Sequence, residues 1–200
     1  MSSIILAAGT QNRWTAQEVE NIPKIKQLIE IEGEILIERI QRQFPGSIVV
    51  TRDEEIKAHS EKIFVPEHYN VTVATLFSTH SLWSDWTTIL LGDVNYGEKT
   101  IELIQHQEKQ LMFYGDKGEI YAFKWYKEIN PLIHWAINTL INRPEWNEMF
   151  GKLWNLYRVI NGNDYRVQKI DKYFTFVNDC RDFDTQRQYV KYAQSQNIRK

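Results

Sequence analysis

The chain begins with an apolar run that leads into small and polar residues: Ile4-Ile5-Leu6-Ala7-Ala8-Gly9-Thr10-Gln11-Asn12-Arg13. An apolar run of this length at the start of an α/β chain predicts a buried strand, and Ala-Ala-Gly leaves room for a ligand to approach the backbone. Backbone N–H groups in such a turn attract anions, and Arg13 adds a charged fork that can hold phosphate oxygens. The stretch therefore predicts a phosphate-binding loop, although a glycine in a strand-to-helix turn can also serve purely steric needs.

A second motif occupies residues 26–39, which read Lys26-Gln27-Leu28-Ile29-Glu30-Ile31-Glu32-Gly33-Glu34-Ile35-Leu36-Ile37-Glu38-Arg39. Together with the N-terminal loop it resembles the sugar-phosphate nucleotidyltransferase family, which includes molybdenum-cofactor guanylyltransferases and cytidylyltransferases. The family pattern runs roughly L-A-A-G-x-G-x-R, a gap, P-K-x-L, a short strand and then G-x-P-L-L-x-R. The chain departs from this pattern at Gln11, which replaces the second glycine of the family loop.

Two lysines are candidates for the lysine of the second motif. Lys24 follows a proline, as in the family's dipeptide, whereas Lys26 brings the downstream leucine and glycine into register without a gap. In the family this lysine helps to neutralise the triphosphate and the charge that develops during transfer, a role that any positioned ammonium can fill. The register favours Lys26, and either lysine alone could instead be a solvated surface charge.

A third match lies in Thr87-Thr88-Ile89-Leu90-Leu91-Gly92-Asp93-Val94-Asn95-Tyr96. Here an apolar strand ends in Gly-Asp, so the carboxylate of Asp93 projects from the carboxyl end of the strand, where open α/β sheets bind their ligands. A carboxylate oxygen is the ligand that Mg²⁺ takes when it also coordinates nucleotide phosphates. Asp93 is therefore the first candidate metal ligand, although an aspartate in this place can also be a helix cap or a turn former.

A fourth match lies near the end of the sequence, in Cys180-Arg181-Asp182-Phe183-Asp184-Thr185-Gln186-Arg187-Gln188-Tyr189, and is similar to the family's closing D-x-D-T-P-E-D-L. Alternation places Asp182 and Asp184 on one face of an extended segment, so both could reach a cation held by Asp93. Asp184 could instead cap the terminal helix. Asn178 and Asp179 are an alternative for the second metal position.

The four matches run from residue 4 to residue 189, so the resemblance spans nearly the whole chain. It implies a three-layer α/β/α, Rossmann-like fold with a mainly parallel mixed sheet, the nucleotide over the N-terminal half and the acceptor over the C-terminal half. The implied activity is a Mg²⁺-dependent transfer in which an acceptor phosphate, of a sugar or a polyol, attacks the α-phosphorus of a nucleoside triphosphate and pyrophosphate leaves. The residues that it implies for nucleotide binding are Leu6, Ala7, Ala8, Gly9, Thr10, Gln11, Arg13 and Lys26.

The same resemblance implies catalytic roles for Arg13 and Lys26, with Lys24 as the alternative lysine, and a metal held by Asp93 with Asp182 or Asp184. Other readings remain open. A glycosyltransferase of the same fold would use a nucleotide-sugar and a metal held by Asp-x-Asp, but an arginine and a lysine suit an attacked triphosphate better. The loss of the loop glycine at Gln11 also allows a nucleotide-binding regulatory protein without activity.

Bulk properties agree with a single enzyme domain over residues 1–200. With 200 residues and 42% hydrophobic content, the chain can bury one substantial core. A net charge of −2 argues against nonspecific nucleic-acid binding. One cysteine excludes an internal disulfide, and no segment approaches the ~20 apolar residues of a spanning helix. We therefore expect a cytoplasmic protein that binds neither nucleic acid nor membranes.

Strands and helices are expected to alternate. The strands are predicted near residues 3–8, 25–31, 47–51, 62–65, 87–92, 110–114, 119–125 and 173–177. The helices are predicted near residues 34–44, 73–83, 97–107, 129–142, 146–157 and 184–196. Strands separated by such helices indicate right-handed crossovers and a mainly parallel sheet.

Aromatic residues are concentrated between residues 125 and 160, and we expect this region to determine acceptor specificity and to form a homodimer contact. The aromatic residues of this region that bear on the prediction are Trp125, Tyr126, Trp135, Trp146, Phe150, Trp154 and Tyr157. Aromatic faces can stack on sugars or bases. At helical spacing, however, such residues are more often part of the core.

Overall fold

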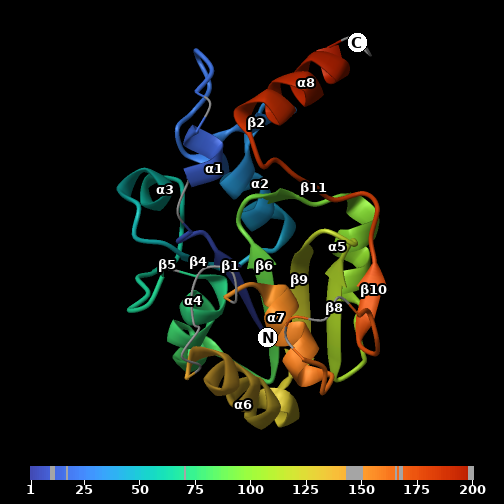
Figure 1. Cartoon of the computed structure of the whole chain (residues 1–200). Coiled ribbons are helices and arrows are strands. Elements are labelled where there is room, and N and C mark those ends of the chain that lie inside the picture. The colour runs from blue at the N-terminus through green and yellow to red at the C-terminus, as the bar shows by residue number, and fades with distance from the viewer. Residues whose placement is uncertain are drawn as a thin grey trace.

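A seven-stranded sheet forms the centre of the molecule in the computed structural model (Figure 1). The structure describes the chain except residues 10, 11, 17, 70, 143–150, 165, 167, 168 and 198–200, and it describes no side chain for residues 12, 13 and 197. From one edge to the other, the strands are β10 (Phe174–Phe176), β8 (Leu111–Gly115), β9 (Ile120–Tyr126), β6 (Trp86–Leu91), β1 (Ser2–Leu6), β4 (Ile48–Val50) and β5 (Ile63–Phe64). Only β9 runs against its neighbours, which confirms the predicted mainly parallel mixed sheet.

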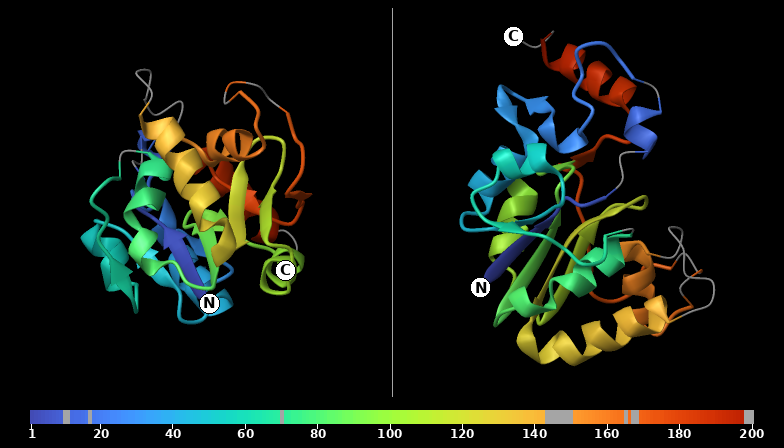
Figure 2. Two further views of the ribbon diagram at one scale, coloured as in Figure 1. Left: turned by 90° about the horizontal axis from the view of Figure 1, so that it is seen from below. Right: turned by 90° about the vertical axis from the view of Figure 1, so that its left-hand side faces the viewer.

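Helices cover both faces of this sheet. Side chains alternate along β1, so that Ile5 and Ala7 belong to one apolar cluster and Ile4 and Leu6 to the other. The first cluster also contains residues of α2 (Leu36–Gln43) and α5 (Glu98–Gln105). The second contains residues of α4 (Thr72–Ser78), α6 (Asn130–Ile141) and α7 (Leu153–Ile160). The three-layer arrangement predicted from the sequence is therefore confirmed (Figure 2).

The strand predicted over residues 25–31 is wrong. Lys26–Leu28 form the 3₁₀ helix η1, and β2 (Glu30–Ile31) pairs with β3 (Glu34–Ile35) in a small hairpin outside the main sheet. The two residues of its turn, Glu32 and Gly33, both have positive φ angles, of 54° and 85°. Such a turn reverses the chain within two residues, so the apolar alternation of this stretch extends into a hairpin rather than a sheet strand.

Short helices account for other differences from the prediction. The helix α3 (Glu54–Ala58) was not predicted, because five residues are too few to show a helical period; Asp53 caps it by accepting hydrogen bonds from the N–H groups of Glu55 and Ile56, at 2.9 and 3.2 Å. The remaining short elements are α1 (Asn12–Thr15), η2 (His80–Leu82) and η3 (Lys127–Ile129). The helix predicted at residues 146–157 falls partly outside the described residues, and α7 begins at Leu153 and ends at Ile160.

The aromatic residues between 125 and 160 mostly belong to the core. Trp125, Trp154 and Tyr157 are buried, and the ring of Trp154 stacks on Phe174 at a centroid distance of 5.3 Å. Trp135 on α6 is 53% exposed. Trp146 and Phe150 lie outside the described residues. The packing alternative therefore holds for the three buried rings, and a homodimer contact through this region stays a prediction.

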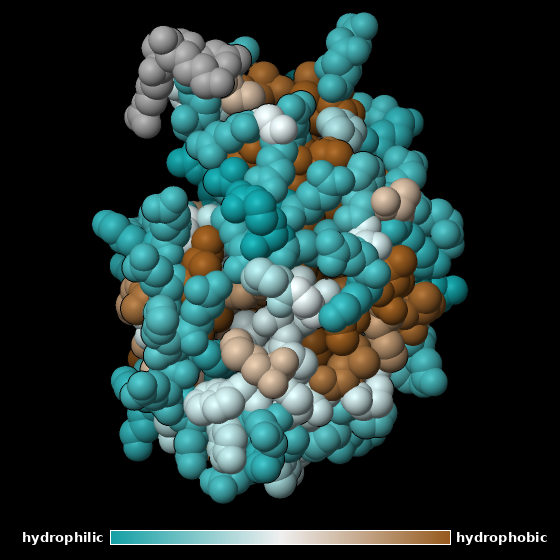
Figure 3. Space-filling view, turned by 180° about the vertical axis from the view of Figure 1, so that it is seen from behind, coloured by the Kyte–Doolittle hydropathy of each residue, from teal (hydrophilic) through white to brown (hydrophobic). Residues whose placement is uncertain are grey.

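Two further segments complete the fold. A two-stranded antiparallel ladder joins β7 (Val94–Asn95) to β11 (Arg181–Asp182), and α8 (Gln186–Asn197) follows it beside the N-terminal helix α1 (Figure 1). Across the described residues, no helix combines the length and the apolar character needed to cross a membrane. On the face opposite to that of Figure 1, the apolar surface is divided into areas separated by polar residues (Figure 3).

Candidate functional site

The four sequence motifs meet at the carboxyl ends of β1 and β6. A pocket at this edge of the sheet is lined by Leu6, Ala8, Gly9, Gln27, Thr72, Thr75, Leu91, Asp93, Glu119, Lys152 and Asp182. These residues come from the loop after β1, from η1, from α4, from the turn after β6, from the turn between β8 and β9, and from β11. Segments that are far apart in the sequence therefore form one site, at the edge where open α/β sheets bind ligands.

The close approach of β6 to β1 requires the glycine that precedes Asp93. The N–H of Gly92 donates a hydrogen bond to the carbonyl oxygen of Leu6 at 2.9 Å. A Cβ atom on Gly92 would lie 3.0 Å from both that oxygen and the Cβ of Ala7, which is tighter than ordinary packing allows. The glycine thus lets the chain after β6 run directly beside the loop after β1, and it places Asp93 next to the predicted phosphate-binding loop.

Lys26 lies inside the site, whereas Lys24 lies on the surface. The ammonium of Lys26 donates hydrogen bonds to Oδ2 of Asp93, at 3.0 Å, and to Oδ1 of Asp182, and its side chain is only 8% exposed. The side chain of Lys24 is 77% exposed and forms an ion pair with Glu18 at 3.5 Å. Of the two lysines that the sequence left open, only Lys26 has the position that the family role requires.

Asp182 reaches this position because of the short ladder between β7 and β11. In that ladder Asp182 lies opposite Val94, the residue that follows Asp93. The two carboxylates therefore lie side by side although 89 residues separate them, and both accept hydrogen bonds from the same ammonium. The pairing predicted between Asp93 and the first aspartate of the closing motif is present.

The three charges alter one another's protonation. Burial by itself would lower the pKa of Lys26, but the adjacent carboxylates of Asp93 and Asp182 outweigh it and raise that pKa. Burial and the neighbouring charge of Asp93 raise the pKa of Asp182, and Lys26 opposes this shift. One ammonium thus compensates two carboxylates only in part, so the site retains an attraction for further positive charge.

The donor set fits a magnesium ion. Two carboxylates already converge on one cation, and Mg²⁺ needs only one or two protein carboxylates when phosphates and water supply its other ligands. Among the residues that the structure describes, no cluster of three or more histidine, cysteine, aspartate or glutamate side chains could hold a metal without such additional ligands. Asp93 and Asp182 are therefore the residues that would hold the ion.

The other candidates for the second metal position lie elsewhere. Asp184 follows β11 and is not among the described residues that line the pocket; its N–H donates a hydrogen bond to Oε1 of Gln188 at 2.7 Å. Asp179 caps α5 instead: its carboxylate accepts hydrogen bonds from the N–H and the hydroxyl of Thr100, at 3.2 and 2.5 Å. The alternative ligand pair of residues 178 and 179 is therefore wrong for Asp179, because its carboxylate is committed to the helix cap.

The loop after β1 is described only in part. Thr10 and Gln11 and the side chain of Arg13 lie outside the described residues, so their predicted contacts with phosphate stay predictions. The N–H of Ala7 donates to the carbonyl oxygen of Val50 at 2.9 Å, which extends the sheet ladder and uses this amide. A Cβ atom on Gly9 would meet no atom within 4 Å, which is consistent with the open approach to the backbone that the sequence predicts.

Sequence reasoning missed several side chains in the pocket. Glu119 lies in the turn between β8 and β9, and Lys152 immediately precedes α7. Neither belongs to a motif, and only knowledge of the strand order brings them to the site. Thr72 and Thr75 fall in the stretch from residue 72 to residue 81 that corresponds to base-contacting segments in the resembled family, but they formed no base-specific pattern.

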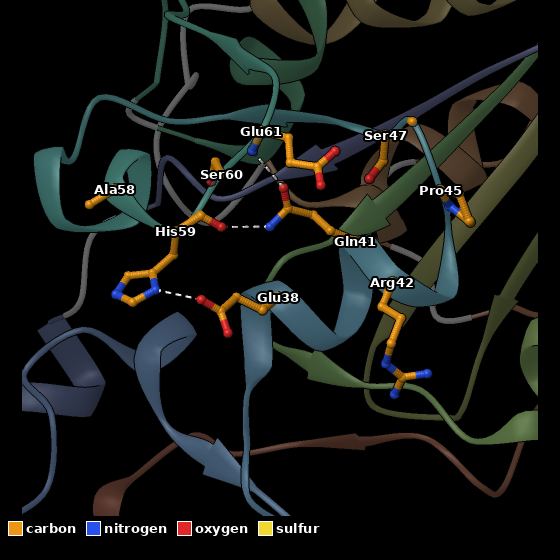
Figure 4. Close-up of a pocket in the computed structure, with 10 residues that line it drawn as sticks. Glu38, Gln41, Arg42, Pro45, Ser47, Ala58, His59, Ser60 and Glu61 are labelled. Atoms are coloured by element: carbon orange, nitrogen blue, oxygen red, sulfur yellow. Dashed lines mark hydrogen bonds and ion pairs between the residues drawn. The ribbon is translucent and has the colours of Figure 1, made fainter.

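A second, larger hollow lies away from these residues. It has a volume of about 610 Å³ and lies on the outer side of α2 and of the turn before β4 (Figure 4). Its polar groups are largely paired with one another: Nδ1 of His59 lies 2.7 Å from Oε1 of Glu38, and the side chain of Gln41 bonds the backbone of His59 and Glu61 at 2.8 and 3.1 Å. None of the predicted catalytic, nucleotide-binding or metal-binding residues lines it.

Comparison with known proteins gives similarity in structure but not in sequence. No protein-family model matches the chain, and no curated protein matches it. Among solved structures, the chain is similar to the CTP:phosphocholine cytidylyltransferase of Streptococcus pneumoniae, with a TM-score of 0.65 at 13% identity, over 96% of this chain and 97% of that one.

Two other solved structures have the same fold. The inositol-1-phosphate CTP transferase from T. maritima gives a TM-score of 0.58 at 12% identity and covers 93% of this chain and 90% of its own. A CMP:2-keto-3-deoxy-manno-octonic acid synthetase, complexed with CTP, gives 0.57 at 12% identity over 98% and 100%. At these identities the similarity establishes the fold, and this fold is the one that the sequence motifs predicted.

Proposed function

We propose that the chain is a Mg²⁺-dependent nucleotidyltransferase that couples a nucleoside triphosphate to a phosphorylated small molecule and releases pyrophosphate. The observation that carries this proposal is the cluster of Lys26, Asp93 and Asp182 beside the Ala7–Gly9 loop. These are the family's lysine and two of its carboxylates, matched residue by residue from separate motifs. Their convergence in one pocket is not required by the fold alone, so it supports the activity more strongly than either the motifs or the fold does separately.

The residues divide the work of the reaction by position. In the proposed reaction a phosphate oxygen of the acceptor forms a bond to the α-phosphorus, and the bond from that phosphorus to the departing pyrophosphate breaks. Lys26 contributes positive charge at the wall of the pocket, where it would offset the charge of the triphosphate and of the departing pyrophosphate. Asp93 and Asp182 would hold Mg²⁺, which when bound neutralises phosphate charge and orients the phosphates. Catalysis is then mainly positioning and electrostatic stabilisation.

The names of the structural neighbours indicate which nucleotide to try first. Two of them are named as CTP-dependent transferases, and the third was solved with CTP. Their phosphorylated substrates differ, so they support a phosphorylated acceptor without choosing one. CTP is therefore our first nucleotide, and sugar phosphates, polyol phosphates and other small phosphate esters are the acceptor panel.

The test is pyrophosphate release by the purified protein with Mg²⁺, each of the four nucleoside triphosphates and this panel. We expect one pair of substrates to give turnover, and Asp93→Asn to reduce kcat about 100-fold or more while the protein remains folded. Asp85→Asn is the matched control, because Asp85 is 68% exposed and pairs only with Lys127 among the described contacts. An Asp93→Asn variant with wild-type rates would refute the metal role.

Nucleotide binding without pyrophosphate release would favour a different function. Calorimetric titration with each nucleotide, with and without Mg²⁺, separates the possibilities. Binding combined with silence across the acceptor panel would point to the regulatory alternative. Neither binding nor turnover would contradict the proposal as a whole.

A further inference from the structure

The pocket contains a second pair of opposite charges, Glu119 and Lys152, on the acceptor side. In the sheet, β6 lies between β1 and β9, and β8 runs parallel to β6. The turn from β8 to β9 therefore lies at the same edge as Asp93 but on the other side of it from the loop after β1. A group bound between Glu119 and Asp93 would face the nucleotide across the metal carboxylates.

The turn that carries Glu119 is held firmly. The carboxylate of Asp116 accepts hydrogen bonds from the N–H groups of Gly118 and Glu119, at 2.6 and 2.9 Å, and from the hydroxyl of Tyr121 at 2.7 Å. The N–H of Asp116 donates in turn to the carbonyl oxygen of Glu119 at 3.0 Å, and Nε1 of Trp154 donates to the carbonyl oxygen of Gly118 at 3.1 Å. Glu119 is thus presented by a braced turn, as a recognition residue needs to be.

Lys152 is fixed at the point where α4 and α7 meet. Its N–H donates to Oδ1 of Asn155 at 3.1 Å, which starts α7. The preceding Gly151 accepts a hydrogen bond from the N–H of Val73 at 2.9 Å, and it packs so closely on Val71 that a Cβ atom would lie 2.3 Å away. The backbone at Lys152 therefore has little freedom, and its ammonium lies at the rim of the pocket.

The charge on this side of the pocket is not balanced by the protein. Burial, together with the charges of Asp93 and Asp182, raises the pKa of Glu119 to about 7, and Lys152 offsets only part of this effect. Lys26 is already shared by the other two carboxylates. A hydroxyl would donate a hydrogen bond to Glu119 but leave its charge uncompensated, whereas an ammonium group would compensate it.

We propose that Glu119 and Lys152 select a dipolar acceptor, a small phosphate ester that carries a cationic amino group. Glu119 binds the cationic end, and Lys152 attracts the phosphate that attacks the nucleotide. This inference rests on the proposed function, since it assigns the acceptor half of the same pocket. It replaces the expectation of an uncharged sugar or polyol with an acceptor whose charge complements that of Glu119.

The first experiment compares acceptors that share a phosphate but differ in the rest of the molecule. The wild-type protein receives Mg²⁺, CTP and one of phosphoethanolamine, phosphocholine, glycerol 3-phosphate or glucose 1-phosphate, and pyrophosphate release is measured. We expect kcat/KM for an amine-bearing acceptor to exceed that for either uncharged one by about tenfold or more. The two amines distinguish a primary from a quaternary ammonium. A preference for an uncharged acceptor would overturn the inference and leave the proposed function standing.

The second experiment uses variants. Glu119→Gln keeps the shape of the side chain but removes its charge, so we expect KM for the amine-bearing acceptor to rise about tenfold or more, with a smaller change for uncharged acceptors. Glu54→Gln is the control, because Glu54 is 83% exposed on α3. Calorimetric titration with phosphoethanolamine and phosphocholine, in the presence of CTP, gives a readout independent of turnover. Binding that Glu119→Gln weakens supports the inference, and no binding of either compound overturns it.

Discussion

Replacing Lys26 by methionine removes the positive charge that two carboxylates share, and it keeps most of the side-chain volume. We expect the variant to be less stable than the wild type without metal, and to recover stability when Mg²⁺ is added. The reason is that Asp93 and Asp182 would face each other in a largely buried place with no cation between them. A divalent ion can occupy the space between two carboxylates, as the ammonium does now.

The size of the effect follows from burial. Removing one partner of a fully buried ion pair costs about 3–5 kcal/mol. Because the side chains of Asp93 and Asp182 are 31% and 20% exposed, water solvates them in part, and we expect a loss of about 2–3 kcal/mol in the free energy of unfolding. For a domain of this size, such a loss lowers Tm by about 5–10 °C.

Urea unfolding with and without Mg²⁺, followed by circular dichroism, measures this prediction. Lys24→Met is the matched control, since its side chain is 77% exposed; we expect a change within about 0.5 kcal/mol and no dependence on Mg²⁺. The reasoning would be refuted if Lys26→Met were as stable as Lys24→Met without metal. Equal stabilisation of the two variants by Mg²⁺ would refute the idea that ion and ammonium occupy the same space.

Three further substitutions test how the surrounding fold supports the site. Gly97→Ala places a Cβ atom 2.3 Å from Oδ2 of Asp179 and should displace this cap of α5, costing about 1–2 kcal/mol in urea unfolding with little change in nucleotide affinity. Lys124→Met leaves the carbonyl oxygens at the end of α5, now 2.8 and 3.0 Å from its ammonium, without this donor and should cost about 1–3 kcal/mol. Tyr96→Phe removes a buried hydroxyl that lies 2.6 Å from the carbonyl oxygen of Tyr121; we expect a loss of about 1–3 kcal/mol by thermal unfolding, and wild-type stability in any of the three variants would contradict its reason.

The sequence predicts the layers of this fold well because apolar periodicity and burial coincide in the main sheet and its large helices. It fails at residues 25–31, where the alternation of Ile25, Ile29 and Ile31 looks like one strand but is interrupted by a 3₁₀ helix and a two-residue turn. Those three residues are buried as expected, yet the pattern of apolar residues does not show where the chain reverses. The reversal depends on positive φ angles at the turn, one of them adopted by a glutamate, which is not a typical turn residue.

The site shows a similar division between what motifs predict and what the tertiary structure decides. The motifs identify Lys26, Asp93 and Asp182, but their order along the chain gives no reason for three residues separated by 67 and 89 positions to meet. The meeting depends on the two-residue ladder between β7 and β11, which is too short to have a strand signal, and on Gly92, which lets β6 approach the loop after β1. Glu119 enters the same pocket only because β9 reverses direction inside an otherwise parallel sheet and returns the turn before it to the carboxyl edge. The residues that perform the proposed chemistry are therefore readable from family motifs, whereas a residue that selects the acceptor is visible only once the strand order is known.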